Sequence, residues 1–121
     1  MIGVEMDFSK YVVILKSLKE QPEEICLEAI KYDSSLLYYI KNQTEKVCLE
    51  AIRQNGIVLT YVYNQTEELC LEAVKQNGLA LGHVHNQTPE ICLEAVRQNG
   101  YALKFVCKKY KFLCEKYISN N

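Results

Sequence analysis

The sequence has almost no net charge and no long apolar segment. Its 14 Lys and Arg residues balance 15 Asp and Glu residues, giving a formal net charge of −1. Such a balance provides no electrostatic attraction to nucleic acid or to an anionic membrane. The apolar run near the start, Val12–Leu15, is far too short for a signal peptide or a membrane span. We therefore expect a soluble protein with a cytoplasmic location and no membrane partner.

The motifs that anchor common enzyme chemistry are also missing. The chain has no GxxxxGK, GxGxxG or GxSxG motif, which argues against nucleotide binding and hydrolase chemistry. The two histidines, His83 and His85, are two positions apart and would not share one face of a helix. No nucleophile, base and orienting group can be assembled from these residues. The prediction is a non-enzymatic protein with no catalytic residue, metal ligand or cofactor.

What the sequence does have is a 22-residue internal repeat, illustrated by QTEELCLEAVKQNGLALGHVHN at 65–86. Such a short period indicates a repeat architecture in which stacked units share one core. We predict a single domain over 1–121, and the predicted divisions are an N-terminal cap with a half repeat (1–20), full repeats (21–42, 43–64, 65–86 and 87–108) and a C-terminal capping half repeat (109–121).

The first half of each unit is typical of an α-helix. Thr66 and Thr88 occupy the expected N-cap position, and Pro89 follows at the first helical position. The body, LEAVKQ, consists of strong helix formers. Glycine follows QN in three units, where we expect a left-handed C-cap, namely at Gly56, Gly78 and Gly100. The first unit departs from this pattern, with Pro22 and Ser34 at the capping positions.

The second half of each unit has two interpretations. The segment LALGHVHN resembles a leucine-rich repeat, in which it would be a strand. However, its aliphatic positions follow i, i+1 and i+4, as in Ala80, Leu81 and Val84. A strand would point the first two side chains to opposite faces, whereas a helix keeps all three together. We therefore predict a second short helix, and an all-α fold: an α-solenoid of 22-residue helix-turn-helix repeats.

The recurring LEAVKQNGLAL segment and the NQTEE connector resemble the repeats of domain of unknown function 4116. The resemblance covers about residues 21–108 fully and both ends in part. This family is abundant in giant viruses of amoebae and also occurs in some bacteria. The resemblance therefore implies helical repeats and is consistent with a viral origin, in which case the location would be the host cytoplasm. It implies no catalytic residue.

Five of the six cysteines hold one position in the unit: Cys26, Cys48, Cys70, Cys92 and Cys114. Equivalent residues on stacked helices should lie at least about 8–10 Å apart. That separation is too long for a shared metal ion or a disulfide. We favour reduced, buried core thiols over metal or redox use. Cys107 lies outside this series and is predicted to be the exposed, reactive thiol.

Candidate binding residues lie in the second half of the units, where the sequence varies or carries rings. They are Tyr38, Tyr39, Tyr61, Tyr63, His83, His85, Lys104 and Phe105. Half-buried packing is the simpler interpretation of the ring series 39, 61, 83 and 105. The first functional hypothesis is binding of an unidentified protein partner through an extended helical surface. The second is single-stranded nucleic-acid binding by base stacking, which the lack of a basic stripe opposes.

The stacking of units yields one further prediction. Leu27, Leu49, Leu71 and Leu93 hold equivalent positions and should be buried between consecutive units. The C-terminal half copy has Glu115 at this position, which fits a closing helix with no following unit to cover it. Substituting Leu71→Ala should then cost about 2–5 kcal/mol, as for a fully buried leucine.

Overall fold

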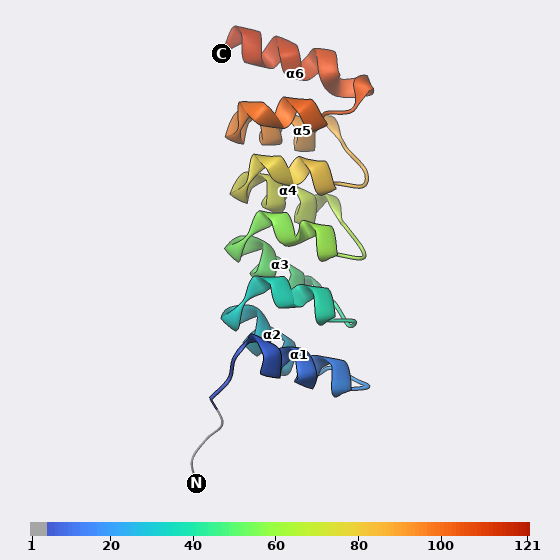
Figure 1. Ribbon diagram of the computed structural model, residues 1–121. Helices are drawn as coiled ribbons and strands as arrows, with labels where there is room; N and C mark the ends of the chain where they lie inside the picture. The colour runs from blue at the N-terminus through green and yellow to red at the C-terminus, as the bar shows by residue number, and fades with distance from the viewer. Residues whose placement is uncertain (1–4) are drawn as a thin grey trace.

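The computed structural model describes residues 5–121, and Figure 1 shows them stacked as a straight rod of helices. Residues 1–4 of the predicted N-terminal cap lie outside the described residues. The described part is all-α, as predicted. Its α-helices are α1 (Phe8–Ser17), α2 (Glu23–Tyr32), α3 (Glu45–Gln54), α4 (Glu67–Gln76), α5 (Pro89–Gln98) and α6 (Lys108–Asn120). Between them lie four 3-10 helices, η1 (Ser34–Tyr39), η2 (Gly56–Tyr61), η3 (Gly78–His83) and η4 (Gly100–Phe105).

The helices form two parallel columns along the rod. The first column stacks α2, α3, α4, α5 and α6, each on the next (Figure 1). The second column stacks α1 and the four 3-10 helices in the same way. Each middle α-helix also contacts the 3-10 helix of its own unit and that of the preceding unit, as α4 contacts η3 and η2. Consecutive units therefore share one continuous core, which neither short helix could provide alone.

Side chains cap both kinds of helix. Thr66 and Thr88 each accept a hydrogen bond from the backbone N–H three residues on, which confirms the predicted N-caps, and Thr44 does the same in α3. Pro89 opens α5 at its first turn, also as predicted. Asp33 and its equivalents in the later units, Asn55, Asn77 and Asn99, cap the 3-10 helices by accepting from the second residue of each. The QN pair thus starts the next helix as well as ending the previous one.

The predicted second helix exists, but it is a 3-10 helix of six residues. Its last turn is closed by i+3 hydrogen bonds, such as Val62 N–H to the Leu59 carbonyl at 3.0 Å. The i, i+1, i+4 residues are nevertheless buried in η1 and η2, and Leu36, Leu37 and Ile40 have no exposed surface. The tighter winding leaves these three residues on one side, which is why the sequence pattern could not distinguish the two helix types.

The predicted left-handed glycine C-caps are wrong: no glycine among the described residues has a positive φ. The three glycines are instead the first residues of the 3-10 helices, and at Gly56 and Gly78 the next unit approaches closely. A Cβ at Gly56 would lie 2.4 Å from the Ala73 carbonyl oxygen, and one at Gly78 would lie 2.4 Å from that of Ala95. Glycine is therefore needed at these two positions for the contact between units, and asparagine ends the α-helix in an extended conformation.

The core is built from an apolar stripe on the α-helices of the repeat units together with the buried residues of the 3-10 helices. In α4 this stripe is Leu69, Cys70, Ala73 and Val74, all buried. The prediction that Leu71 and its equivalents are buried is only partly correct: Leu27, Leu49, Leu71 and Leu93 are half-buried and pack against the edge of the core. Leu71 lies beside the stripe, so one flank of its side chain faces solvent. We therefore lower the expected cost of Leu71→Ala to about half of that for a fully buried leucine.

Candidate binding face

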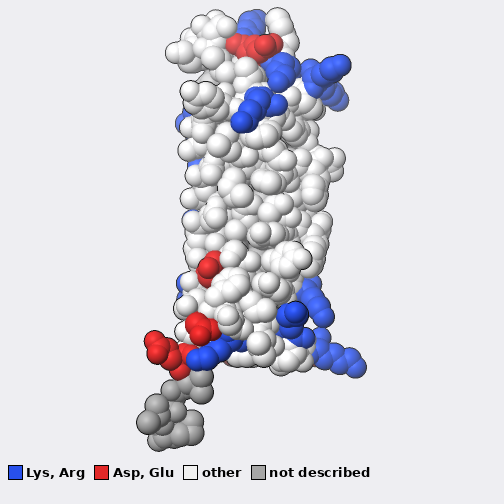
Figure 2. Space-filling view, in the orientation of Figure 1, with Lys and Arg blue, Asp and Glu red and all other residues white. Residues whose placement is uncertain are grey.

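The second column presents a face with very little charge. Of the residues in the four 3-10 helices, only Lys104 carries a formal charge. Figure 2 shows one side of the rod, on which Lys, Arg, Asp and Glu side chains gather near the two ends and leave the middle nearly free of charge. A long uncharged surface on a rod of this size is a candidate for contact with another macromolecule.

Four of the predicted site residues meet at one place on this face. The Tyr38 ring lies edge-on to the rings of Tyr39 and Tyr61, with centroids 5.0 and 5.4 Å apart. Phe8 of α1 adds a fourth ring, 6.4 Å from Tyr39. Tyr39 and Tyr61 are half-buried, whereas Tyr38 is 60 % exposed. The inner rings hold the outer ring in a fixed position by edge-to-face contact.

These tyrosines line a groove of about 550 Å³, which we call the tyrosine groove. Tyr63, which is 64 % exposed, forms part of its wall. The full lining is Lys16, Tyr38, Tyr39, Lys41, Thr60, Tyr61 and Tyr63. Sequence reasoning did not assign a role to Lys16, because that residue belongs to the half repeat at the start of the rod. The groove therefore combines aromatic surface with two lysines and contains no carboxylate.

The remaining predicted site residues lie farther along the column and do not join this groove. His83 is half-buried on η3 and His85 is exposed in the following connector. Lys104 lies over the ring of Phe105, with its ammonium 5.1 Å from the ring centroid. A Cβ at Gly82 would meet the Phe105 ring at 3.1 Å, so the Phe105 side chain packs closely on the preceding unit.

Sequence reasoning missed a series of glutamines that open the four full repeats: Gln21, Gln43, Gln65 and Gln87. The Gln65 amide nitrogen donates to the His83 carbonyl at 2.9 Å and to the Leu59 carbonyl at 3.2 Å. Its amide oxygen accepts from the His85 backbone N–H at 2.9 Å. One side chain thus forms hydrogen bonds with backbone groups at the ends of two successive 3-10 helices. The signal in the sequence was the recurrence of glutamine at the first position of all four full repeats.

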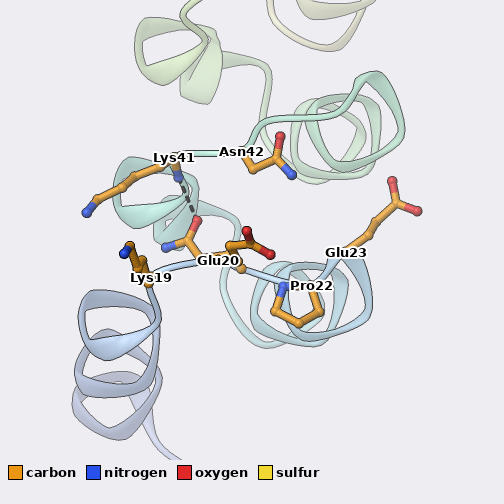
Figure 3. A pocket seen from close by; sticks show the side chains of 7 residues that line it. Lys19, Glu20, Pro22, Glu23, Lys41 and Asn42 are labelled. Carbon is orange, nitrogen blue, oxygen red and sulfur yellow. Dashed lines mark hydrogen bonds between the residues drawn. The ribbon is translucent and has the colours of Figure 1, made fainter.

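Figure 3 shows a surface hollow in the first unit, where a dashed line marks the hydrogen bond between the Lys41 backbone and the glutamine side chain. The Gln21 amide oxygen accepts from the Lys41 backbone N–H at 2.7 Å, and its nitrogen donates to the Leu15 and Tyr39 carbonyls. The hollow is lined by Lys19, Glu20, Gln21, Pro22, Glu23, Lys41 and Asn42. Gln21 is 4 % exposed, so its hydrogen bonds serve the backbone and leave little for a ligand.

The five equivalent cysteines are buried and Cys107 is exposed, as predicted. The thiol of Cys70 lies 3.6 Å from the amide oxygen of Gln65, and that of Cys92 lies 3.2 Å from the amide oxygen of Gln87. The cysteine is therefore a weak hydrogen-bond donor behind the glutamine as well as a small core residue. Burial, with a smaller contribution from the nearby Glu67, raises the pKa of Cys70 to about 11.

These raised pKa values predict slow alkylation of the buried thiols. Burial also raises the pKa of Cys48 to about 11 and that of Cys92 to about 12. At pH 8 a thiol with a pKa of 11 is about one part in a thousand thiolate, the form that reacts. We expect iodoacetamide to modify Cys107 first in the native protein, with the buried series following at least about a hundredfold more slowly. Mass mapping of a time course checks this, and rapid labelling of Cys70 would contradict it.

The same shifts make folding stability depend on pH. The unfolded thiols ionise near about 8.5, whereas the folded ones keep their protons to higher pH. The contribution to stability is therefore complete below about pH 8.5 and is lost as the pH rises toward the folded pKa values. Urea unfolding at pH 8 and pH 10 should show this loss. The loss of stability should be smaller in Cys70→Ala. Because tyrosine and lysine titrate equally in the variant and the wild type, the difference between the two proteins reports on the Cys70 thiol.

The part of the chain that the structure describes, residues 5–121, holds no cluster of three or more His, Cys, Asp or Glu side chains with the geometry of a metal site. In the same range, every helix is too short or too polar to cross a membrane. What this part of the chain offers is surface for binding: aromatic rings in a groove, set on a stack of capped helices.

Comparison with known proteins identifies the family. The model for the domain of unknown function (DUF4116) matches twice, over residues 23–66 and 66–111. The two matches together cover well over half of the chain, so the chain belongs to this family, as its repeats predicted. Each match spans about two of the 22-residue units. Neither the curated proteins nor the solved structures include a match to this chain.

Proposed function

We propose that this member of the domain of unknown function 4116 family is a non-enzymatic helical-repeat protein that binds another protein through its second column. The observation that carries the proposal is the tyrosine groove, in which exposed Tyr38 packs against the half-buried rings of Tyr39 and Tyr61 and exposed Tyr63 forms part of the wall. We propose that it acts in the cytoplasm, and in the host cytoplasm if the chain is viral.

A protein partner suits the chemistry of this groove. Tyrosine is enriched at protein interfaces because it offers a large apolar ring and a hydroxyl at low cost in conformational entropy. Tyr38 is already fixed by its contacts with Tyr39 and Tyr61, so little freedom is lost when a partner covers it. The helices η1, η2 and η3 carry no formal charge, so a partner can cover them without removing charges from water, and only Lys16 and Lys41 of the groove would have to be paired or stay hydrated.

Single-stranded nucleic acid is the second candidate, and the ring series at 39, 61, 83 and 105 is what favours it. Base stacking needs ring faces open to solvent. Tyr39 is half-buried and meets Tyr38 at an interplanar angle of 89°, which covers part of one ring with the edge of the other. The chain as a whole is slightly acidic, so phosphate contacts would have little support. The protein partner is therefore the better-supported candidate.

The proposal is tested with the variant Tyr38→Ser/Tyr63→Ser. Both side chains are more exposed than buried, so the fold should survive, and a far-UV circular dichroism spectrum checks this. In a quantitative pull-down from extract of the native host, at least one protein retained by the wild type should be depleted at least about tenfold with the double variant. The purified partner should then show the same loss in a direct binding titration.

Tyr101→Ser is the matched control. Tyr101 is 82 % exposed on η4, outside the tyrosine groove, so the same chemical change there should leave partner retention unaltered. If no protein distinguishes the double variant from this control, the protein-binding proposal is wrong. A fluorescently labelled single-stranded RNA, titrated at low salt, addresses the second candidate. Binding that disappears in the double variant would favour nucleic acid over protein.

A further inference from the structure

The tyrosine groove is positively charged, although the chain as a whole has a net charge of −1. Lys16 stands in the last turn of α1, and Lys41 follows Ile40, the C-cap of η1. Both side chains are exposed, and none of the ion pairs within residues 5–121 includes either lysine. The two ammonium groups can therefore pair with a negative charge that another molecule brings to the groove.

The repeat itself does not require a lysine at either position. The residue one unit on from Lys16 is Tyr38, and the residue one unit on from Lys41 is Tyr63, so the stack accepts a neutral side chain at both places. Lys19 holds the position one unit before Lys41. In Figure 3 the side chains of Lys19 and Lys41 extend to the same side of the hollow, away from the Glu23 carboxylate. Positive charge thus gathers at this part of the rod and is not a general property of its units.

Aromatic surface lies beside the two ammonium groups. The Tyr38 ring is 5.0 Å from the Tyr39 ring and 5.4 Å from the Tyr61 ring, so the three rings form one apolar patch. Tyr38 and Tyr63 are exposed, and their hydroxyl groups can donate hydrogen bonds to a carboxylate. The groove volume of about 550 Å³ lies within the range of about 300–1,000 Å³ typical of pockets for drug-sized ligands. The groove therefore accommodates a few side chains of a partner.

A carboxylate suits this groove better than a phosphate does. Proteins often recognise phosphate with the planar fork of arginine, which pairs with two oxygens at once, and no arginine lines the groove. A nucleic-acid chain carries a phosphate at every nucleotide, and its affinity depends on several such contacts, whereas the groove offers two lysines. A carboxylate carries a single charge, which one ammonium group can balance. A peptide can place carboxylates directly beside apolar side chains.

We propose that the tyrosine groove binds a short acidic segment of the partner protein. Asp or Glu carboxylates of this segment pair with Lys16 and Lys41, and a neighbouring apolar side chain packs on the rings of Tyr38 and Tyr61. The inference rests on the proposed function, because it states what the protein partner presents to the same groove. The apolar contact supplies most of the affinity, whereas the exposed ion pairs select acidic segments over basic ones.

Selection from a random peptide library tests this inference. Short random peptides displayed on phage are selected on the immobilised wild type. An excess of soluble Tyr38→Ser/Tyr63→Ser removes those peptides that bind elsewhere on the rod. Compared with the unselected library, the retained sequences should contain an excess of Asp and Glu over Lys and Arg. These acidic residues should lie beside aromatic or aliphatic residues, because the lysines of the groove lie beside its rings.

Reversing the two charges provides the second measurement. A retained peptide with a fluorescent label should bind Lys16→Glu/Lys41→Glu at least about tenfold more weakly than the wild type, and Lys16→Gln/Lys41→Gln should lose less. The same peptide with lysines in place of its carboxylates should prefer the charge-reversed variant to the wild type. Lys46→Glu/Lys75→Glu is the matched control, because it changes the net charge equally and neither lysine lines the groove. Far-UV circular dichroism checks that each variant is folded.

Retained peptides without an excess of acidic residues would overturn the acidic-segment inference, and so would an equal loss of affinity in the groove and control variants. A selection that recovers no groove-dependent peptide would also overturn it. The pull-down described above decides the proposed function separately, because it does not depend on the charge of the partner. A short single-stranded RNA at low salt is the phosphate-bearing probe. If it binds the wild type more tightly than every retained peptide and loses this binding on charge reversal, the groove binds nucleic acid and both proposals are wrong.

Discussion

Gly78→Ala should destabilise the protein by about 3 kcal/mol or more, the upper end of the range for overpacked sites. The new Cβ would lie 2.4 Å from the Ala95 carbonyl oxygen, which belongs to the backbone of α5. It would also lie 2.9 Å from the side-chain oxygen of Gln98, which accepts a hydrogen bond from the Gly78 N–H. A side chain could rotate away from such a clash, but a helix backbone cannot, so the contact between units would have to open.

Gly100→Ala provides the matched control. Gly100 holds the equivalent position in the last full unit, yet a Cβ there would meet nothing within 4 Å. Its φ is not positive, so alanine can adopt the same backbone conformation and should be neutral or stabilising by up to about 1 kcal/mol. Urea unfolding of both variants measures the difference. Equal effects at 78 and 100 would show that glycine serves the local backbone and not the contact between units.

The two periods in the sequence were sufficient to predict the fold. The 22-residue period required stacked units, and the i, i+1, i+4 spacing of residues such as Ala80, Leu81 and Val84 required helices in the second half. Both patterns indicate which side chains face the core. Core-facing side chains dominate the free energy of folding, so these patterns are the part of the architecture that a single sequence specifies most strongly.

Features that depend on how closely the backbones of two units approach each other could not be predicted from the sequence in this way. Glycine after QN is compatible with a left-handed cap and with close contact to a neighbouring helix, and only the position of Ala95 above Gly78 distinguishes the two. The 3-10 winding likewise leaves the buried residues unchanged. The tyrosine groove needed the fold as well, because it joins Lys16 of α1 to Tyr63, which lies 47 positions along the chain.

The glutamine side chains give the equivalent cysteines a second role, as weak hydrogen-bond donors. Cys70 was predicted to be a buried core thiol, and its burial confirms that part. However, alanine or valine would also be small. The thiol differs in being able to donate weakly to the Gln65 amide oxygen, which already accepts the His85 N–H. Cysteine therefore fits a site that is mostly apolar but has one acceptor at its edge.

Replacing Gln65 should also lower the free energy of unfolding substantially. Gln65→Met keeps the length and much of the volume of the side chain but removes its hydrogen bonds to Leu59, His83 and His85. A hydrogen bond contributes about 0.5–1.5 kcal/mol net, and a buried partner left unsatisfied costs about 1–3 kcal/mol. We expect a loss of about 2–4 kcal/mol in the free energy of unfolding, measured by urea denaturation.

Gln54→Met is the control for this substitution. Gln54 is exposed at the end of α3, so methionine there should change stability by no more than about 0.5 kcal/mol. Hydrogen exchange separates the hydrogen-bonding role of Gln65 from simple packing, because the His85 amide donates to the Gln65 oxygen. In Gln65→Met the His85 amide should lose its protection while amides inside α4 keep most of theirs. Retained protection at His85, together with a stability loss, would mean that Gln65 acts by filling space and not by joining the ends of successive 3-10 helices.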